Sequence, residues 1–200
     1  GFLLAFIAFA LLAFPAVFLA GFAAASLGLS PVTLSMLALA YASAYLLLLF
    51  GIVVMSCLWT YRAWRNLHDL GLTGLRYSPG WAVGSYFVPL VNLYVPFKAM
   101  RELYNRSAGD DEFQADSSAE LVTSWWACAV GAFAVQLFQN GVDLFNTNGV
   151  VFIVAPPTVD LAMSLLGIIL SLAATFLYWK LVGRITREQL EMKSASQAFA

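Results

Sequence analysis

The chain has 200 residues, of which 62% are hydrophobic and 10% are charged, and its formal net charge is −1. Soluble globular proteins carry about 25% charged residues, so this composition excludes an ordinary soluble domain and predicts a single membrane domain over residues 1–200. The nearly neutral charge also argues against nucleic acid as a partner.

Residues 1–61 contain no Asp, Glu, Lys, Arg or His. As a helix this run would measure about 90 Å, roughly three times the hydrocarbon thickness of a bilayer. Gly28 is suited to end a helix, and Pro31 is suited to begin the next one. We therefore predict two membrane spans, over residues 3–25 and 32–59.

The first predicted span carries phenylalanines around a broad face, at positions 2, 6, 9, 14, 18 and 22. Contact with membrane lipids is the simpler explanation of this face. The alternative is that it packs against another membrane protein subunit, or holds a bound lipid, isoprenoid or pigment molecule.

Charged residues return directly after the second predicted span. Arg62, Arg65, Asn66 and Asp69 recur at helical spacing, which predicts an amphipathic extension of that helix ending near Gly71. The face formed by Arg62, Arg65 and Asn66 has two interpretations. It binds lipid headgroups or an acidic loop of a partner, or it is a helix end whose cations reach the headgroups and set the topology.

Residues 77–97 carry no charge, but Pro79, Gly80, Pro89 and Pro96 interrupt them. A backbone broken in this way must find hydrogen bonds to protein or water at membrane depth. We therefore expect a re-entrant or interfacial segment rather than a span. Asn92 is a candidate ligand-binding group in this segment, and the alternative is that it braces the turn.

A short amphipathic turn follows, with Lys98, Arg101 and Glu102 on one face. Two arrangements are open for Arg101 and Glu102. They form a buried pair with Arg62 or Arg65, or they lie as a solvated surface pair that contributes little stability. Residues 107–120 then have the composition of an acidic, solvated loop.

The last two predicted spans cover residues 122–138 and 159–181. Between them, turn-forming residues at 139–141 and 146–149 predict a surface excursion over residues 139–157. Thr158 is a suitable N-cap for the last helix. The polar tail, residues 182–200, is expected to begin as a continuation of that helix.

All ten Lys and Arg fall on one side of this four-span map, at positions 62, 65, 76, 98, 101, 106, 180, 184, 187 and 193. The positive-inside rule assigns that side to the cytoplasm. We therefore predict an all-α, polytopic membrane protein with four transmembrane helices, both termini in the cytoplasm and residues 60–120 forming a motif region there. The six tryptophans, Trp81 among them, fall near the same boundary, where indole rings prefer to lie.

Several segments together form a recognisable pattern: Trp59-Thr60-Tyr61-Arg62-Ala63-Trp64-Arg65-Asn66-Leu67, Tyr77-Ser78-Pro79-Gly80-Trp81-Ala82-Val83-Gly84, Phe87-Val88-Pro89-Leu90-Val91-Asn92-Leu93, Pro96, Arg101-Glu102-Leu103 and Arg184-Ile185-Thr186-Arg187-Glu188-Gln189. This pattern resembles domain-of-unknown-function family 4328, a bacterial multi-spanning membrane family without an assigned activity. The resemblance implies a location in the bacterial inner membrane and transfers no catalytic residue. Val95 departs from the basic or polar residue expected before Pro96.

The sequence predicts no catalytic residue, metal site or cofactor. Cys57 and Cys128 lie within apolar runs, and His68 has no second ligand at suitable spacing. The predicted spans also lack the ionisable groups that pumps and ion transporters need at depth. These observations favour a protein that is not an enzyme.

We therefore expect a non-catalytic accessory or structural subunit that packs against a larger membrane protein complex. Two alternatives stay open: a small-solute transporter or channel that uses residues 77–97, and a membrane enzyme that acts on lipid headgroups. The candidate residues for binding a partner or a lipid headgroup are Arg62, Arg65, Asn66, Trp81, Asn92, Arg101 and Glu102.

Overall fold

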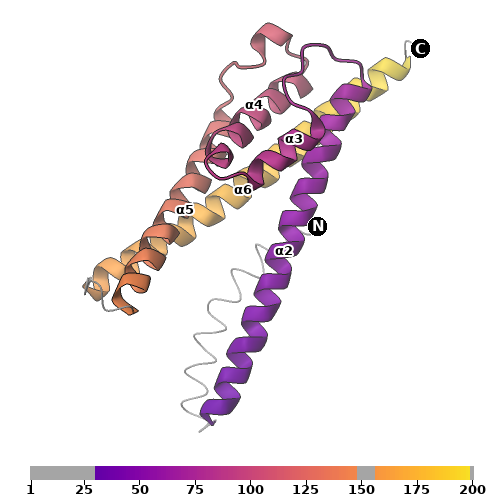
Figure 1. The fold of residues 1–200 in the computed structure, drawn as a ribbon. Coiled ribbons are helices and arrows are strands. Elements are labelled where there is room, and N and C mark those ends of the chain that lie inside the picture. The colour runs from indigo at the N-terminus through magenta and orange to yellow at the C-terminus, as the bar shows by residue number, and fades with distance from the viewer. Residues whose placement is uncertain (1–29, 148–155, 199–200) are drawn as a thin grey trace. The chain divides into compact units, whose positions relative to one another are not determined.

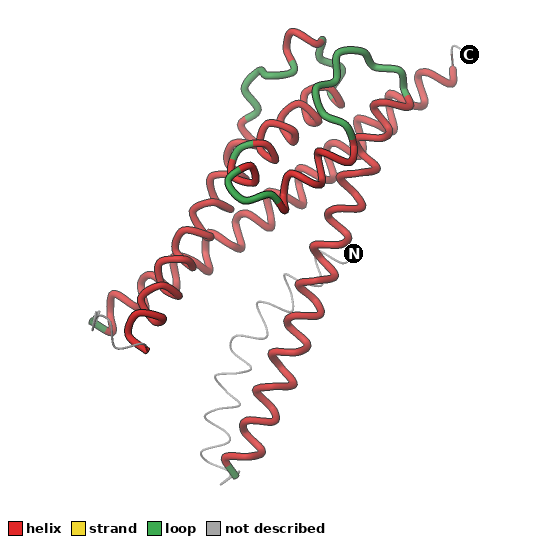
Figure 2. Tube along the Cα trace, in the orientation of Figure 1, coloured by secondary structure: helices red, strands yellow, loops and turns green. Residues whose placement is uncertain are grey.

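A computed structural model describes residues 30–147 and 156–198, which form helices joined by turns and loops (Figures 1 and 2). The predicted all-α class is confirmed for this part of the chain. The longer helices are α2 (Pro31–Asp69), α4 (Val95–Ser107), α5 (Glu120–Thr147) and α6 (Pro157–Ala198). The shorter ones are α3 (Pro79–Gly84) and the 3-10 turns η1 (Ser85–Phe87), η2 (Val91–Leu93) and η3 (Glu112–Gln114).

Three helices in the described ranges, α2, α5 and α6, are long and apolar enough to cross a membrane. They make the chain a multi-pass membrane protein. The expected first span, residues 3–25, lies outside the described residues, so the count of four spans stays a prediction. The chain divides into two compact units, residues 1–59 and 60–200, and α2 runs through the boundary between them.

Helix α2 begins and ends where the sequence predicts. Ser30 lies before its first residue, Pro31, and the Ser30 hydroxyl accepts a hydrogen bond from the backbone N–H of Thr33 at 3.2 Å. After Asp69 the chain turns at Gly71, whose φ of +74° suits a residue without a Cβ. The predicted amphipathic extension is therefore the last part of one continuous helix of 39 residues.

Helices α5 and α6 pack side by side along their apolar lengths (Figure 1). Small residues allow the close approach: a Cβ on Gly131 would lie 3.3 Å from Leu170, and a Cβ on Gly167 would lie 3.2 Å from Val135. The Gln139 amide also donates to the Ser164 hydroxyl at 2.9 Å. This pair is the membrane-spanning part of the second unit.

The helix that contains the predicted span over residues 122–138 is longer than that span. Helix α5 continues to Thr147, so a large part of the expected surface excursion over 139–157 is helical. Asn140 and Gly141 have poor helix propensity, but the preference is weak and packing overrides it. Here the hydrogen bond from Gln139 to Ser164 holds the continuing helix against α6.

Residues 77–97 contain no helix of spanning length, as their prolines and glycine predict. Helix α3 starts at Pro79 after its N-cap Ser78, whose hydroxyl accepts from the backbone N–H of Trp81 at 3.2 Å. The short turns η1 and η2 then lead into α4. The segment is thus a series of short helical pieces.

Residues 60–120 and the part of α6 from Lys180 onward form one packed body, which we call the cap. Its core is fully buried and comes from three helices: Trp64 and Leu67 from α2, Met100 and Leu103 from α4, and Leu181 and Ile185 from α6. As predicted, the tail continues as helix, because α6 is a single helix of 42 residues that ends at Ala198.

Candidate functional site

Gln189 joins three helices inside the cap. Its side-chain amide is 6% exposed and uses all of its hydrogen-bonding groups. The Oε1 atom accepts from Asn66 Nδ2 at 3.0 Å, and the Nε2 group donates to the Ala63 carbonyl and the Ser107 hydroxyl, each at 3.0 Å. A buried amide that is satisfied in this way holds residues 60–69 at the end of α2 against α4 and α6.

Arg106, near the end of α4, holds two loops with one guanidinium group. It donates from Nη1 to the Asp110 carbonyl and from Nη2 to the Thr73 carbonyl, both at 2.7 Å. Its side chain is almost wholly buried, so these bonds form in a medium that strengthens charge-assisted hydrogen bonds. The loop after α2 and the loop after α4 are thereby fixed to each other.

Asn105 fixes the acidic loop, residues 107–120, to the end of α4. Its buried Nδ2 group lies 3.1 Å from the Ala115 carbonyl and 3.0 Å from the Ser117 carbonyl. The Gln114 carbonyl is at 3.3 Å and the Ser117 hydroxyl at 3.1 Å. The residues 107–120 that the composition predicted as a solvated loop are therefore closely held on their inner side.

Glu102 lies in the cap with 1% of its surface exposed. Its Oε1 atom accepts from the backbone N–H of Arg76 at 2.9 Å, whereas Oε2 has no hydrogen-bond partner among the described residues. Burial raises the pKa of this carboxyl group, and the nearby Arg76 only partly opposes the shift. Burial and the charge of Glu102 also raise the pKa of Tyr77.

Asp116 bridges two arginines at the edge of the cap. It pairs with Arg76, and its Oδ1 atom lies 3.1 Å from Arg101 Nη2. Partial burial alone would raise the pKa of Asp116, but hydrogen bonds from the two guanidinium groups lower it. Neither of the two arrangements predicted for Arg101 and Glu102 was right: Arg101 pairs with Asp116, and Glu102 binds the Arg76 backbone.

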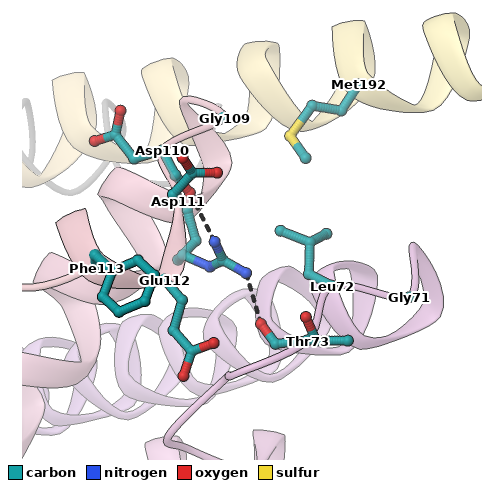
Figure 3. A pocket seen from close by; sticks show the side chains of 10 residues that line it. Gly71, Leu72, Thr73, Gly109, Asp110, Asp111, Glu112, Phe113 and Met192 are labelled. Carbon is teal, nitrogen blue, oxygen red and sulfur yellow. Dashed lines mark hydrogen bonds between the residues drawn. The ribbon is translucent and has the colours of Figure 1, made fainter.

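A hollow of about 600 Å³ opens beside these loops (Figure 3). The acidic residues Asp110, Asp111 and Glu112 line one part of it, and the loop after α2 and Met192 of α6 line the rest. We call it the acidic hollow; its lining residues are Gly71, Leu72, Thr73, Arg106, Gly109, Asp110, Asp111, Glu112, Phe113 and Met192.

The acidic hollow combines unpaired charge with exposed apolar surface. Asp110, Asp111 and Glu112 form no ion pair with a described Lys or Arg. Phe113 projects beside them and is 98% exposed. Exposed aromatic side chains with polar residues around them are typical of a binding surface.

The structure separates the predicted site residues into two groups. Asn66, Arg101 and Glu102 lie in the polar contacts of the cap, described above. The others lie outside that network: Arg62 is exposed, Arg65 pairs at 3.7 Å with Asp69 on the helix surface, Trp81 is exposed and Asn92 is half-buried in η2. Of the Arg62, Arg65 and Asn66 face, Asn66 is the residue that takes part in the hydrogen bonds of the cap described above.

The sequence reasoning missed Gln189, Asn105, Arg106 and Phe113. The sequence holds one signal for Gln189: the apolar residues Leu181 and Ile185 precede it at intervals of about one helical turn. Both are fully buried in the structure. A polar residue that continues such an apolar stripe is placed inside the core, where its amide must be satisfied.

A comparison with protein families agrees with the resemblance that the sequence motifs indicate. A family described as Domain of unknown function (DUF4328) matches residues 30–187. No curated protein and no solved structure matches the chain. Because the match covers most of the sequence, the chain belongs to this family, as its motifs predicted.

Proposed function

We propose that this family member is a non-catalytic accessory subunit of a bacterial inner-membrane protein complex. In this proposal the cap lies in the cytoplasm and offers the acidic hollow to a basic, partly apolar segment of a neighbouring subunit. The observation that carries the proposal is Phe113, which is 98% exposed beside three carboxylates that form no ion pair with a described residue. Exposed aromatic side chains of this kind commonly supply the anchor of a protein contact.

The lining of the hollow defines the chemistry of the partner segment. Its carboxylates favour Lys or Arg, and complementary charge increases both the rate and the specificity of association. Leu72, Phe113 and Met192 offer apolar surface, and methionine adapts its shape readily to a partner. A segment that alternates basic and apolar side chains meets both demands.

The hydrogen bonds of the cap support a preformed binding surface. Arg106 holds both sides of the hollow through Thr73 and Asp110. A surface that is already fixed loses little conformational entropy on binding, which leaves more of the contact energy for affinity.

The membrane helices support assembly with other subunits. Helices α5 and α6 expose large apolar side chains along their outer faces, among them Leu137, Phe138, Leu165 and Ile169. Such faces suit lipid and the helices of another subunit equally. The basic residues of the sequence support the cytoplasmic placement of the cap.

The proposal is tested by purifying the chain from native membranes in mild detergent and measuring the mass of the particle that contains it. We expect one partner polypeptide at a fixed stoichiometry, released by high salt. Phe113→Ala and the double variant Asp111→Asn, Glu112→Gln should each reduce its recovery about tenfold, as loss of an interface anchor does.

Two surface variants serve as matched controls. Leu190 is exposed on α6 and Glu191 follows it, and neither lines the hollow. Leu190→Ala and Glu191→Gln should therefore leave the recovery of the partner unchanged. A lone monomer at every salt concentration would contradict the proposal. Solute flux in vesicles that Asn92→Ala abolishes would favour the transporter or channel instead.

A further inference from the structure

We infer that residues 87–94, which we call the apolar tip, insert into the headgroup and upper acyl region of the bilayer that the chain's own helices cross. The ligand of this surface is lipid, and the inference does not depend on the proposed partner. Its consequence is that α4 is anchored to the membrane at its N-terminal end. Four observations lead to it: exposure, backbone strain, position and charge.

The apolar tip exposes side chains that water solvates poorly. Leu90 is 82% exposed and Phe87 is 65% exposed, and Leu93 and Tyr94 lie beside them with half or more of their surface open. The whole run of residues 77–97 carries no Asp, Glu, Lys, Arg or His. A contiguous apolar patch of this kind marks contact with a membrane or with a protein.

The backbone of the tip holds Leu90 outward against its own preference. Leu90 has φ +66° and ψ −41°, and it is the one described non-glycine residue with positive φ. A leucine in such a conformation is strained, and strain of this kind concentrates at functional positions. The strained residue is also the one whose side chain is the most exposed of the tip.

The tip lies at the level where aromatic residues border the membrane spans. Three residues after the tip, Phe97 stacks on Trp126 of α5 with ring centroids 6.4 Å apart. The neighbouring Trp125 contacts Trp126 at 5.3 Å and Tyr178 of α6 at 5.6 Å. These rings lie at the ends of the charge-free stretches 121–142 and 161–179, the depth that Trp and Tyr prefer in a bilayer.

The charges next to the tip suit a lipid surface. Lys98 Nζ lies 4.8 Å from the centroid of the Tyr94 ring, and it forms no ion pair with a described carboxylate. Cations placed beside interfacial aromatic rings attract lipid phosphates. The sequence of the tip contains no Asp or Glu, so nothing in it repels anionic headgroups.

The second exposed aromatic position, Phe113, provides a contrast within the same cap. It follows α4 in the chain, whereas the apolar tip precedes that helix of 13 residues, which is about 20 Å long. Phe113 is surrounded by carboxylates, which disfavour an anionic membrane surface. The same helix thus separates a lipid-facing end from a water-facing end.

The test measures the depth of a fluorophore in nanodiscs that contain the full chain, phosphatidylcholine and phosphatidylglycerol. Cys57 and Cys128 are replaced by Ala, and an environment-sensitive nitrobenzoxadiazole label is attached to Leu90→Cys, Leu93→Cys or, as the matched control, Phe113→Cys. We expect blue-shifted emission at positions 90 and 93. Lipids spin-labelled near the headgroup should quench these two labels at least threefold more than the label at 113.

A further variant separates insertion from folding. In the Leu93→Cys background, Leu90→Asp should reduce the lipid quenching toward the value at position 113, while circular dichroism shows the same helix content. Because the nanodisc holds no other subunit, a buried label there reports lipid alone. Labels at 90 and 93 with the emission and quenching of the label at 113 would overturn the inference and indicate a protein-binding tip.

Discussion

Glu102 carries its carboxyl group into the buried interior of the cap. A carboxylate that is buried with one unpartnered oxygen is disfavoured in its charged form, which is why burial raises its pKa. The folded state therefore holds this proton to higher pH than the unfolded chain does. Stability must fall as the pH rises from the ordinary glutamate value through the raised folded value.

Glu102→Gln keeps the acceptor for the Arg76 N–H and removes the charge. We predict that the variant melts at a higher temperature than the wild type at pH 8 and at nearly the same temperature at pH 4. The measurement is the melting temperature in detergent micelles across this range. Glu191→Gln, on the exposed face of α6, is the control. Equal pH profiles for Glu102→Gln and the wild type would show that Glu102 is not buried as described.

Gly74 supplies a backbone conformation that other residues adopt at a cost. Its φ is +73°, and an added Cβ would overlap the Glu112 carboxyl group. We predict that Gly74→Ala destabilises the cap by about 1–2 kcal/mol in urea unfolding. Because Glu112 is flexible, the double variant Gly74→Ala, Glu112→Ala should retain most of this loss.

Gly80 is the matched control for Gly74. It lies in α3 with open space around its Cα and without a positive φ, so alanine fits there. Gly80→Ala should be neutral or stabilise the protein by up to about 1 kcal/mol, because alanine has the higher helix propensity. A loss of stability equal to that of Gly74→Ala would remove the conformational explanation.

At the scale of elements, α6 connects the membrane to the cap through Gln189. Gln189→Ala removes three hydrogen bonds and leaves the buried Ala63 carbonyl and Ser107 hydroxyl with fewer partners. We predict a loss of about 2–4 kcal/mol in urea unfolding, since unsatisfied buried groups bear a large desolvation cost. Glu191→Ala, two residues further on the exposed face, should change stability by less than about 0.5 kcal/mol.

The elements show how far the sequence could be interpreted. Helices α2 and α6 follow from their charge-free runs and from terminal signals such as Pro31 and Gly71, because these act locally. The continuation of α5 past Asn140 depends on packing against α6, which local propensity cannot show. The partners of Arg101 and Glu102 come from the loops after α4 and α2, which fold back onto α4. The motif therefore identifies these two residues but cannot give their contacts.

At the scale of the whole molecule, an even number of spans would place both ends of the chain on the same side of the membrane. We predict that reporters fused at residue 111 and after Ala200 face the cytoplasm, and that one inserted at residues 148–155 faces the opposite side. A reporter placed before Gly1 should share the side of the carboxyl terminus, because an even number of crossings returns the chain to its starting side. A reporter at 111 on the outer side, with the carboxyl end inside, would contradict the map.

Because α6 is one continuous helix, a change of length at Lys180 would move the part that packs in the cap relative to the apolar part in the membrane. A helix of 42 residues measures about 63 Å, and each added residue rotates the remainder of the helix by about 100° and lifts it by about 1.5 Å. One residue inserted between Lys180 and Arg184 would swing the amide of Gln189 away from Ala63 and Ser107. The number of residues at this junction therefore sets both the height and the rotation of the cap-facing part of α6. We expect the junction to tolerate substitution far better than insertion or deletion.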